Sequence, residues 1–281
     1  NPEWRQLFAH AVHEAERRGN EIVLASGPGR CGTGGPWVKP EQSMQHLVAS
    51  ETNVIGPARF DGDLPLAKPR APFFGEGTLT PELKQQRREF YRDVAVLAFP
   101  KPKGDRRIAD LDEKALYQRA PYSSFPGVKS SLPMPAEHPA WPAAECIAQD
   151  GVVDLTSQMS PDGRLTLDVP PGEWTILRFI RTATGQITRP APAPGLGFET
   201  DKFDAAAIDA HFERFVGTLL KEVGPRKNGP GGLTTLHFDS WEMSSQNWSE
   251  KFRAEFQQRR GYDPLRFLPA FTGRVVDTAE T

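Results

Sequence analysis

The chain has 281 residues, a formal charge of −2 and a hydrophobic content of 38%. The length suits one large domain or two small ones, and the lack of a basic face or arm argues against a nucleic-acid partner. No apolar run approaches the roughly 18 residues of a membrane span, so no membrane span is expected. Cys31 and Cys146 lie far apart without metal-ligand spacing, and we interpret them as unpaired thiols.

The first segment has the signals of a helix. Asn1 can cap it, Pro2 suits its first position, and Gly19 can end it. Apolar residues recur at helical spacing and predict one buried face: Trp4, Leu7, Phe8, Ala11, Val12 and Ala15.

A short buried strand is expected over 21–25, and a glycine-rich loop follows over 26–37. The loop matches the G-x-G-x-x-G spacing of dinucleotide-binding folds. Glycine and proline continue past the motif, however, where a helix would have to begin so that its amides met a pyrophosphate. We therefore interpret the loop as one that carries Trp37 to the rim of a pocket, or as a structural loop with Trp37 as a packing plug. A second helix is expected over 40–50.

From about residue 91 the pattern changes to short alternating strands, which continue to about residue 186. Turn signals and proline-rich stretches separate and flank them. The expected strands include 152–155, 165–169 and 174–179, with turns at 161–163 and 170–172. This texture predicts an inserted antiparallel β-sandwich-like domain over 91–190.

Alternating helices and strands return after the insertion. Asp204 can cap a helix that Gly224 ends, a strand is expected over 233–238, and a helix over about 247–260. The alternation predicts an α/β fold with parallel strands. Only three strands of this kind are expected, whereas a (β/α)8 barrel needs eight. The chain is therefore either a small open sheet or part of a longer chain.

The strand over 233–238 stops at Asp239-Ser240-Trp241-Glu242, two carboxylates beside an indole. Carboxyl ends of strands carry the chemistry in α/β folds, and sugar cleavage needs a carboxyl group that protonates the leaving oxygen. Glu242 is the candidate general acid; the alternative is a helix-entry or surface carboxylate. Asp239 can orient a sugar hydroxyl, hold a metal, tune Glu242 or cap the next turn, but it lies too near Glu242 in the chain to attack from the opposite sugar face.

Aromatic and amide side chains supply candidate substrate-binding residues. Trp37, Trp241 and Trp248 can stack on a pyranose face. Asn247 is a further candidate substrate-binding residue. His237 points opposite to its neighbours in a regular strand, and we interpret it as a core histidine rather than a catalytic one.

Glu199 and Asp201 form a second acidic cluster at a third expected strand end, over 195–201. Alternation puts both side chains on one face, and converging carboxylates can hold calcium, which prefers oxygen ligands. The alternative is a salt bridge with Lys202 or with arginines. No zinc-ligand spacing, G-x-S-x-G elbow, H-E-x-x-H or Walker motif is present.

Several segments, taken together, resemble glycoside hydrolase family 106, the α-L-rhamnosidases. The resemblance covers nearly the whole chain, and its motifs are long and specific. They are GTGGPWVKPEQSMQ (32–45), FYRDVAVLAFP (90–100), the run over 152–179, GFETDK (197–202), HFDSWEMSSQNW (237–248) and the run over 259–276.

The resemblance implies inverting hydrolysis of terminal α-L-rhamnosyl residues from plant polysaccharides, glycosides or flavonoids, with calcium assisting at the sugar. The glutamate of the family's D-S-W-E motif is the general acid and maps to Glu242. Glu199 and Asp201 map loosely as the calcium ligands. The general base is a glutamate on a later strand, expected beyond Thr281, so this chain alone is expected to be inactive.

The implied fold is a partial (β/α)8 TIM-type barrel interrupted by the β-sandwich-like domain: barrel over 1–90, insertion over 91–190 and barrel again over 191–281. A rhamnose-containing carbohydrate is the expected partner. The resemblance favours the periplasm or secretion, although no signal peptide is seen at the amino end. Incomplete strands predict a poorly soluble or partly unfolded fragment. A second hypothesis is a non-catalytic carbohydrate-binding or assembly module.

Overall fold

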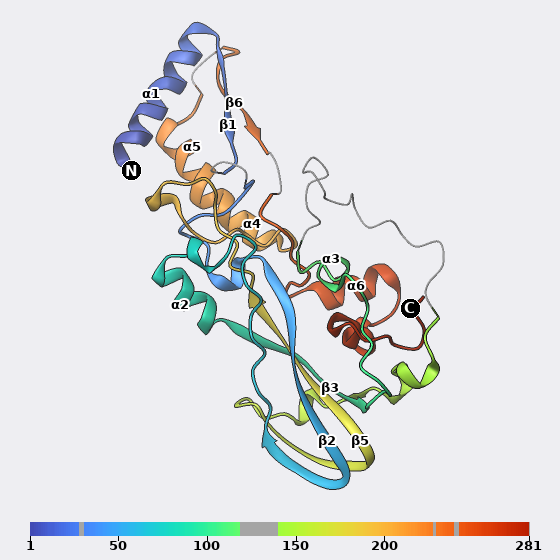
Figure 1. Cartoon of the computed structure of the whole chain (residues 1–281). Helices are drawn as coiled ribbons and strands as arrows, with labels where there is room; N and C mark the ends of the chain where they lie inside the picture. The colour runs from blue at the N-terminus through green and yellow to red at the C-terminus, as the bar shows by residue number, and fades with distance from the viewer. Residues whose placement is uncertain (28–30, 119–139, 227–228, 239–241, 281) are drawn as a thin grey trace. The chain divides into compact units, whose positions relative to one another are not determined.

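The structure, a computed structural model, describes residues 1–27, 31–118, 140–226, 229–238 and 242–280. Figure 1 draws the whole chain. The chain divides into two compact units. Unit 1 consists of Asn1–Met44, Ala71–Arg87 and Gly185–Ser244; unit 2 consists of Gln45–Arg70, Arg88–Thr184 and Ser245–Thr281. None of the helices in the described ranges is long and apolar enough to cross a membrane.

Unit 1 begins with the predicted helix, α1 (Pro2–Arg18). The Asn1 side chain accepts a hydrogen bond from the Glu3 amide at 2.9 Å, and Gly19 ends the helix in the left-handed conformation. The expected apolar face is buried only in part, because Trp4 and Leu7 are largely exposed.

Two parallel strands, β1 (Glu21–Ala25) and β6 (Gly232–His237), form the sheet of unit 1. The predicted helix after Asp204 is present as α4 (Ala205–Phe212), a π-helical turn (Glu213–Gly217) and α5 (Thr218–Val223). An apolar cluster joins these helices and α1 to the strands: Leu24, Val216 and Leu219, with Phe8, Phe215, Leu233 and Leu236 packed against them.

The sheet of unit 1 differs from the expectation in two ways. Segment 195–201 is not a strand; it forms only isolated bridges, Ser43 with Thr200 and Ile187 with Phe198. Half of the residues of strand β6 are exposed, among them His237, which was expected in the core. Burial of a parallel strand requires cover on both faces. The described residues therefore show a mixed helix and sheet fold, and they do not confirm a partial TIM-type barrel.

The prediction of a helix over 40–50 was wrong. A 3-10 turn (Pro40–Gln42) leads into a long strand, β2 (Gln45–Asp63). The remaining short elements of unit 1 are helix α2 (Pro81–Glu89), which ends in unit 2, and two 3-10 helices, Glu76–Thr78 and Ala193–Gly195.

Unit 2 is built on one four-stranded antiparallel sheet with the order β2-β5-β3-β4. Its other strands are β3 (Tyr91–Pro100), β4 (Val153–Asp154) and β5 (Arg164–Ala183). The predicted antiparallel texture is thus confirmed, but the described residues form a single sheet rather than a sandwich. β5 also runs through the turn expected at 170–172, where an irregularity in its pairing with β2 absorbs one extra residue of β5.

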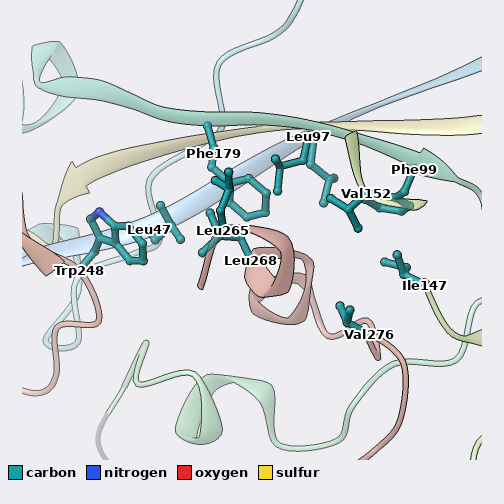
Figure 2. Close-up of a cluster of buried hydrophobic side chains, with 12 residues drawn as sticks. Leu47, Leu97, Phe99, Ile147, Val152, Phe179, Trp248, Leu265, Leu268 and Val276 are labelled. Atoms are coloured by element: carbon teal, nitrogen blue, oxygen red, sulfur yellow. The ribbon is translucent and has the colours of Figure 1, made fainter. Parts of the chain in front are cut away.

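Unit 2 also contains the helical segments α3 (Leu111–Lys114), α6 (Phe252–Arg260) and the 3-10 helix Pro264–Thr272, with shorter 3-10 turns at Ala143–Glu145, Gln149–Gly151 and Thr156–Gln158. Figure 2 shows the core between sheet and helices, which contains Leu47, Leu97, Phe99, Ile147, Val152, Phe179, Trp248, Leu265, Leu268 and Val276. Strand β2 belongs to this sheet although its residues precede position 91, the expected start of the β-rich insertion.

Candidate functional site

The described part of the D-S-W-E motif is its final residue, Glu242, which is half-buried. Asp239 and Trp241 lie outside the described residues, so their roles stay predictions. The next residue, Met243, is buried in a cluster with Cys31 and Met44. The segment that follows Glu242 is thereby anchored to the loop that follows β1. Parallel strands place their carboxyl ends at the same edge, which is where α/β folds bind ligands.

The loop that follows β1 packs backbone against backbone on the segment 197–199. The Gly35 amide donates to the Phe198 carbonyl at 3.2 Å. A Cβ atom on Gly197 would lie 1.9 Å from the Gly35 carbonyl oxygen, and Gly34 has a φ of +117° that disfavours other residues. Close backbone contact therefore explains Gly34 and Gly197.

Glu199 is a deeply buried charged side chain in this region, with 1% of its surface exposed. Its Oε1 atom accepts hydrogen bonds from the Lys202 ammonium and from Thr33 Oγ1, the latter at 3.1 Å. Its Oε2 atom accepts none from the described residues. Burial raises the pKa of Glu199, and the Lys202 charge opposes that rise. Cys31 lies close by, where burial and the Glu199 carboxylate raise the pKa of its thiol to about 12, so this thiol is not an activated nucleophile.

His211 joins helix α4 to the same loop. Its Nε2 atom lies 2.8 Å from the Ser26 carbonyl oxygen, while Nδ1 accepts from the Gly34 amide at 3.2 Å and from Trp37 Nε1 at 3.3 Å. Burial lowers the pKa of His211. Trp37 also stacks on Phe215, with ring centroids 6.0 Å apart. These contacts agree with the packing-plug alternative for Trp37.

Asn247 and Trp248, expected to bind substrate, are structural residues of unit 2. Asn247 accepts from the Leu47 amide and donates to the Ala115 carbonyl, both at 2.8 Å. Trp248 is 2% exposed and packs in the core against Phe252. A sugar needs an open aromatic face and unused polar atoms, and these side chains are instead covered and hydrogen-bonded.

Glu199 and Asp201, expected to hold calcium, do not form a calcium ligand set as they lie here. The Glu199 carboxylate already binds an ammonium, and Asp201 Oδ1 accepts from the Phe203 amide at 2.8 Å. Within the described ranges, no group of three or more His, Cys, Asp or Glu side chains could hold a metal ion. The contacts instead match the salt-bridge alternative, with Lys202 as the partner.

A sequence model of the α-L-rhamnosidases, glycoside hydrolase family 106, matches residues 1–281. The chain belongs to this family. A curated protein of Formosa agariphila, named "Putative beta-glucuronidase", is 34% identical over 281 residues, which are 99% of this chain and 21% of that protein. A solved rhamnosidase from Novosphingobium sp. PP1Y is 23% identical and has the same fold over 100% of this chain and 37% of its own, with a TM-score of 0.73. This family member thus spans about a fifth and a third of these two relatives.

Sequence reasoning missed the role of His211 and of Thr33. The missed signal for His211 is its position: it lies four residues after Ala207 and four before Phe215, on the inward face of the predicted helix. Thr33 gave no signal of its own, because its partners Glu199 and Lys202 come from a distant part of the chain.

Proposed function

We propose that this chain carries part of the catalytic region of an inverting α-L-rhamnosidase, with Glu242 as the general acid. Family membership supports a glycoside hydrolase. The observation that carries the assignment of the acid is the buried cluster of Met243, Cys31 and Met44, which ties the residue after Glu242 to the loop at the carboxyl end of β1. Catalytic side chains of α/β enzymes are concentrated at such ends.

In the proposed reaction, Glu242 gives its proton to the glycosidic oxygen as the bond from that oxygen to the anomeric carbon breaks. A second carboxylate takes a proton from water, whose oxygen attacks the anomeric carbon from the opposite face. The two carboxyl groups must stand roughly 6.5–9.5 Å apart to leave room for that water. Because the chain spans 21% and 37% of its two relatives, we place the base in a part of the protein outside these 281 residues.

The sugar is the second half of the proposal. α-L-Rhamnose is a 6-deoxy sugar with a methyl group at C6, whereas a β-glucuronide carries a carboxylate there. A buried carboxylate requires a cationic partner. The match to the α-L-rhamnosidase family model supports the uncharged 6-deoxy sugar.

The test is a substrate panel with the complete protein that carries this chain. We expect hydrolysis of a natural α-L-rhamnoside and of an aryl α-L-rhamnoside, no hydrolysis of an aryl β-glucuronide, and β-L-rhamnose as the first product seen by proton NMR. Cleavage of the glucuronide alone would refute the proposed sugar. An initial α-L-rhamnose signal would refute inversion, and binding of rhamnosides without turnover would favour a carbohydrate-binding module.

A further inference from the structure

The Lys202 ammonium lies in an environment of oxygen atoms. It donates to the Glu199 carboxylate, to Thr33 Oγ1 at 2.8 Å and to the Thr200 carbonyl at 3.1 Å. Carboxylate, hydroxyl and carbonyl oxygens are also what a hard metal ion prefers as ligands. The lysine side chain is 14% exposed and the glutamate 1%, so this cation is largely enclosed by the chain itself.

Charge balance requires a cation at this position. A carboxylate as buried as Glu199 carries a large desolvation penalty unless an opposite charge is hydrogen-bonded to it. Lys202 supplies that charge. A calcium ion on the same carboxylate would meet the ammonium at a few ångströms, where like charges repel strongly in a water-poor site.

We propose that the Lys202 ammonium is the cation that neutralises the Glu199 carboxylate. It takes the position that a metal ion would otherwise hold beside Glu199. The ammonium joins Thr33, in the loop after β1, to the segment 197–202. Cys31 lies in that loop and shares a buried cluster with Met44 and Met243, so the same bond helps to position the segment that follows Glu242. Lys202 is therefore a positioning residue, and this inference does not depend on the identity of the substrate.

The first arm of the test measures calcium binding to the complete protein by titration calorimetry. The variants are Glu199→Gln and Thr33→Val, and both are close to isosteric. Glu199→Gln removes the negative charge, and Thr33→Val removes the hydroxyl oxygen. We expect the calcium affinity, or its absence, to match that of the wild-type protein within about twofold in both variants, because neither residue binds calcium. A loss of tenfold or more in either variant would overturn the proposal.

The second arm measures amide hydrogen exchange in segments 31–37 and 197–203. Lys202→Met should make exchange in both segments faster by about tenfold or more, because a buried carboxylate loses its counter-charge. EDTA should leave both segments of the wild-type protein unchanged. The matched control is Lys221→Met, an exposed lysine on α5, which should change neither. Wild-type segments that lose protection in EDTA, or a Lys202→Met protein that keeps it, would contradict the proposal. If Lys202→Met fails to fold, the calcium arm still decides it.

Discussion

The indole nitrogen of Trp37 lies 3.3 Å from Nδ1 of His211, the same atom that accepts the Gly34 amide at 3.2 Å. An imidazole nitrogen that accepts two N–H groups cannot itself carry a proton. The other nitrogen, Nε2, faces the Ser26 carbonyl and must be the donor. The contacts therefore fix His211 as the neutral Nε2–H tautomer. A proton on Nδ1 would face the N–H groups of Gly34 and Trp37 and would break both hydrogen bonds.

This arrangement predicts that the loop after β1 weakens in acid. Burial lowers the pKa of His211 below its ordinary 6.5. The unfolded chain therefore takes up this proton at a higher pH than the folded chain does. The stabilising contribution of neutral His211 is complete above about pH 6.5 and is lost as the pH falls from there through the folded pKa.

We expect the opening free energy of segment 31–37, measured by native-state hydrogen exchange, to fall between about pH 7.5 and 5.5. His211→Gln should flatten this dependence. His13→Gln, a change on the exposed side of α1, should preserve it. An unchanged slope in His211→Gln would show that another group is responsible.

The contact between Gly197 and Gly35 predicts a sharp difference between two glycines. Gly197→Ala places a Cβ atom 1.9 Å from a backbone oxygen, whereas at Gly195 the nearest atoms are 3.7 Å away. We expect Gly197→Ala to lower the free energy of unfolding by about 3 kcal/mol or more, and Gly195→Ala to change it by less than about 1 kcal/mol. Denaturant titration of both variants checks this, and equal effects would mean that the loop is free to shift.

The two thiols should differ in reactivity. Cys31 is buried and its thiol has a pKa of about 12, while Cys146 is half-buried with a pKa raised by its own partial burial. Since the thiolate is the reactive form, iodoacetamide at neutral pH should alkylate Cys146 first and Cys31 only after denaturation. Peptide mass spectrometry of the two sites measures this order. Early labelling of Cys31 would show that the cluster of Cys31, Met44 and Met243 opens readily.

Local signals predicted part of the fold correctly. Caps at Asn1, Gly19, Asp204 and Gly224 gave helix limits because a cap depends only on residues next to it. Strand β2 was missed, since Met44, Leu47 and Val48 have helical spacing. What makes 45–63 a strand is its long pairing with β5, which comes more than 100 residues later.

The candidate site was predictable only where its chemistry lies within one short motif. The Glu199–Lys202 pair was foreseen as an alternative because both residues lie in GFETDK. Asn247 and Trp248 were assigned to substrate because they follow Glu242 in sequence. Their actual partners, such as Leu47 and Phe271, come from other parts of the chain and bury them.

Substitution of Trp248 therefore tests whether this side chain packs in the core or stacks on the sugar. Trp248→Ala should lower the free energy of unfolding by about 3–5 kcal/mol, as expected for loss of a buried aromatic ring. The milder Trp248→Phe should leave rhamnose affinity unchanged in calorimetry of the complete protein, because the ring is covered by Phe252 and Phe271. A large loss of rhamnose affinity in a stably folded Trp248→Phe protein would restore the platform role.

The role of Glu242 is tested by Glu242→Gln in the complete protein. Glutamine keeps the shape of the side chain but cannot donate the catalytic proton, so turnover of a natural rhamnoside should fall by about 10²–10⁴-fold while rhamnose binding survives. An aryl rhamnoside with a good leaving group needs less protonation and should be affected less. Glu255→Gln, on the exposed side of α6 where Glu255 pairs with Arg259, is the matched control and should keep full activity. Near-normal turnover of the natural rhamnoside by Glu242→Gln would assign the acid to another residue.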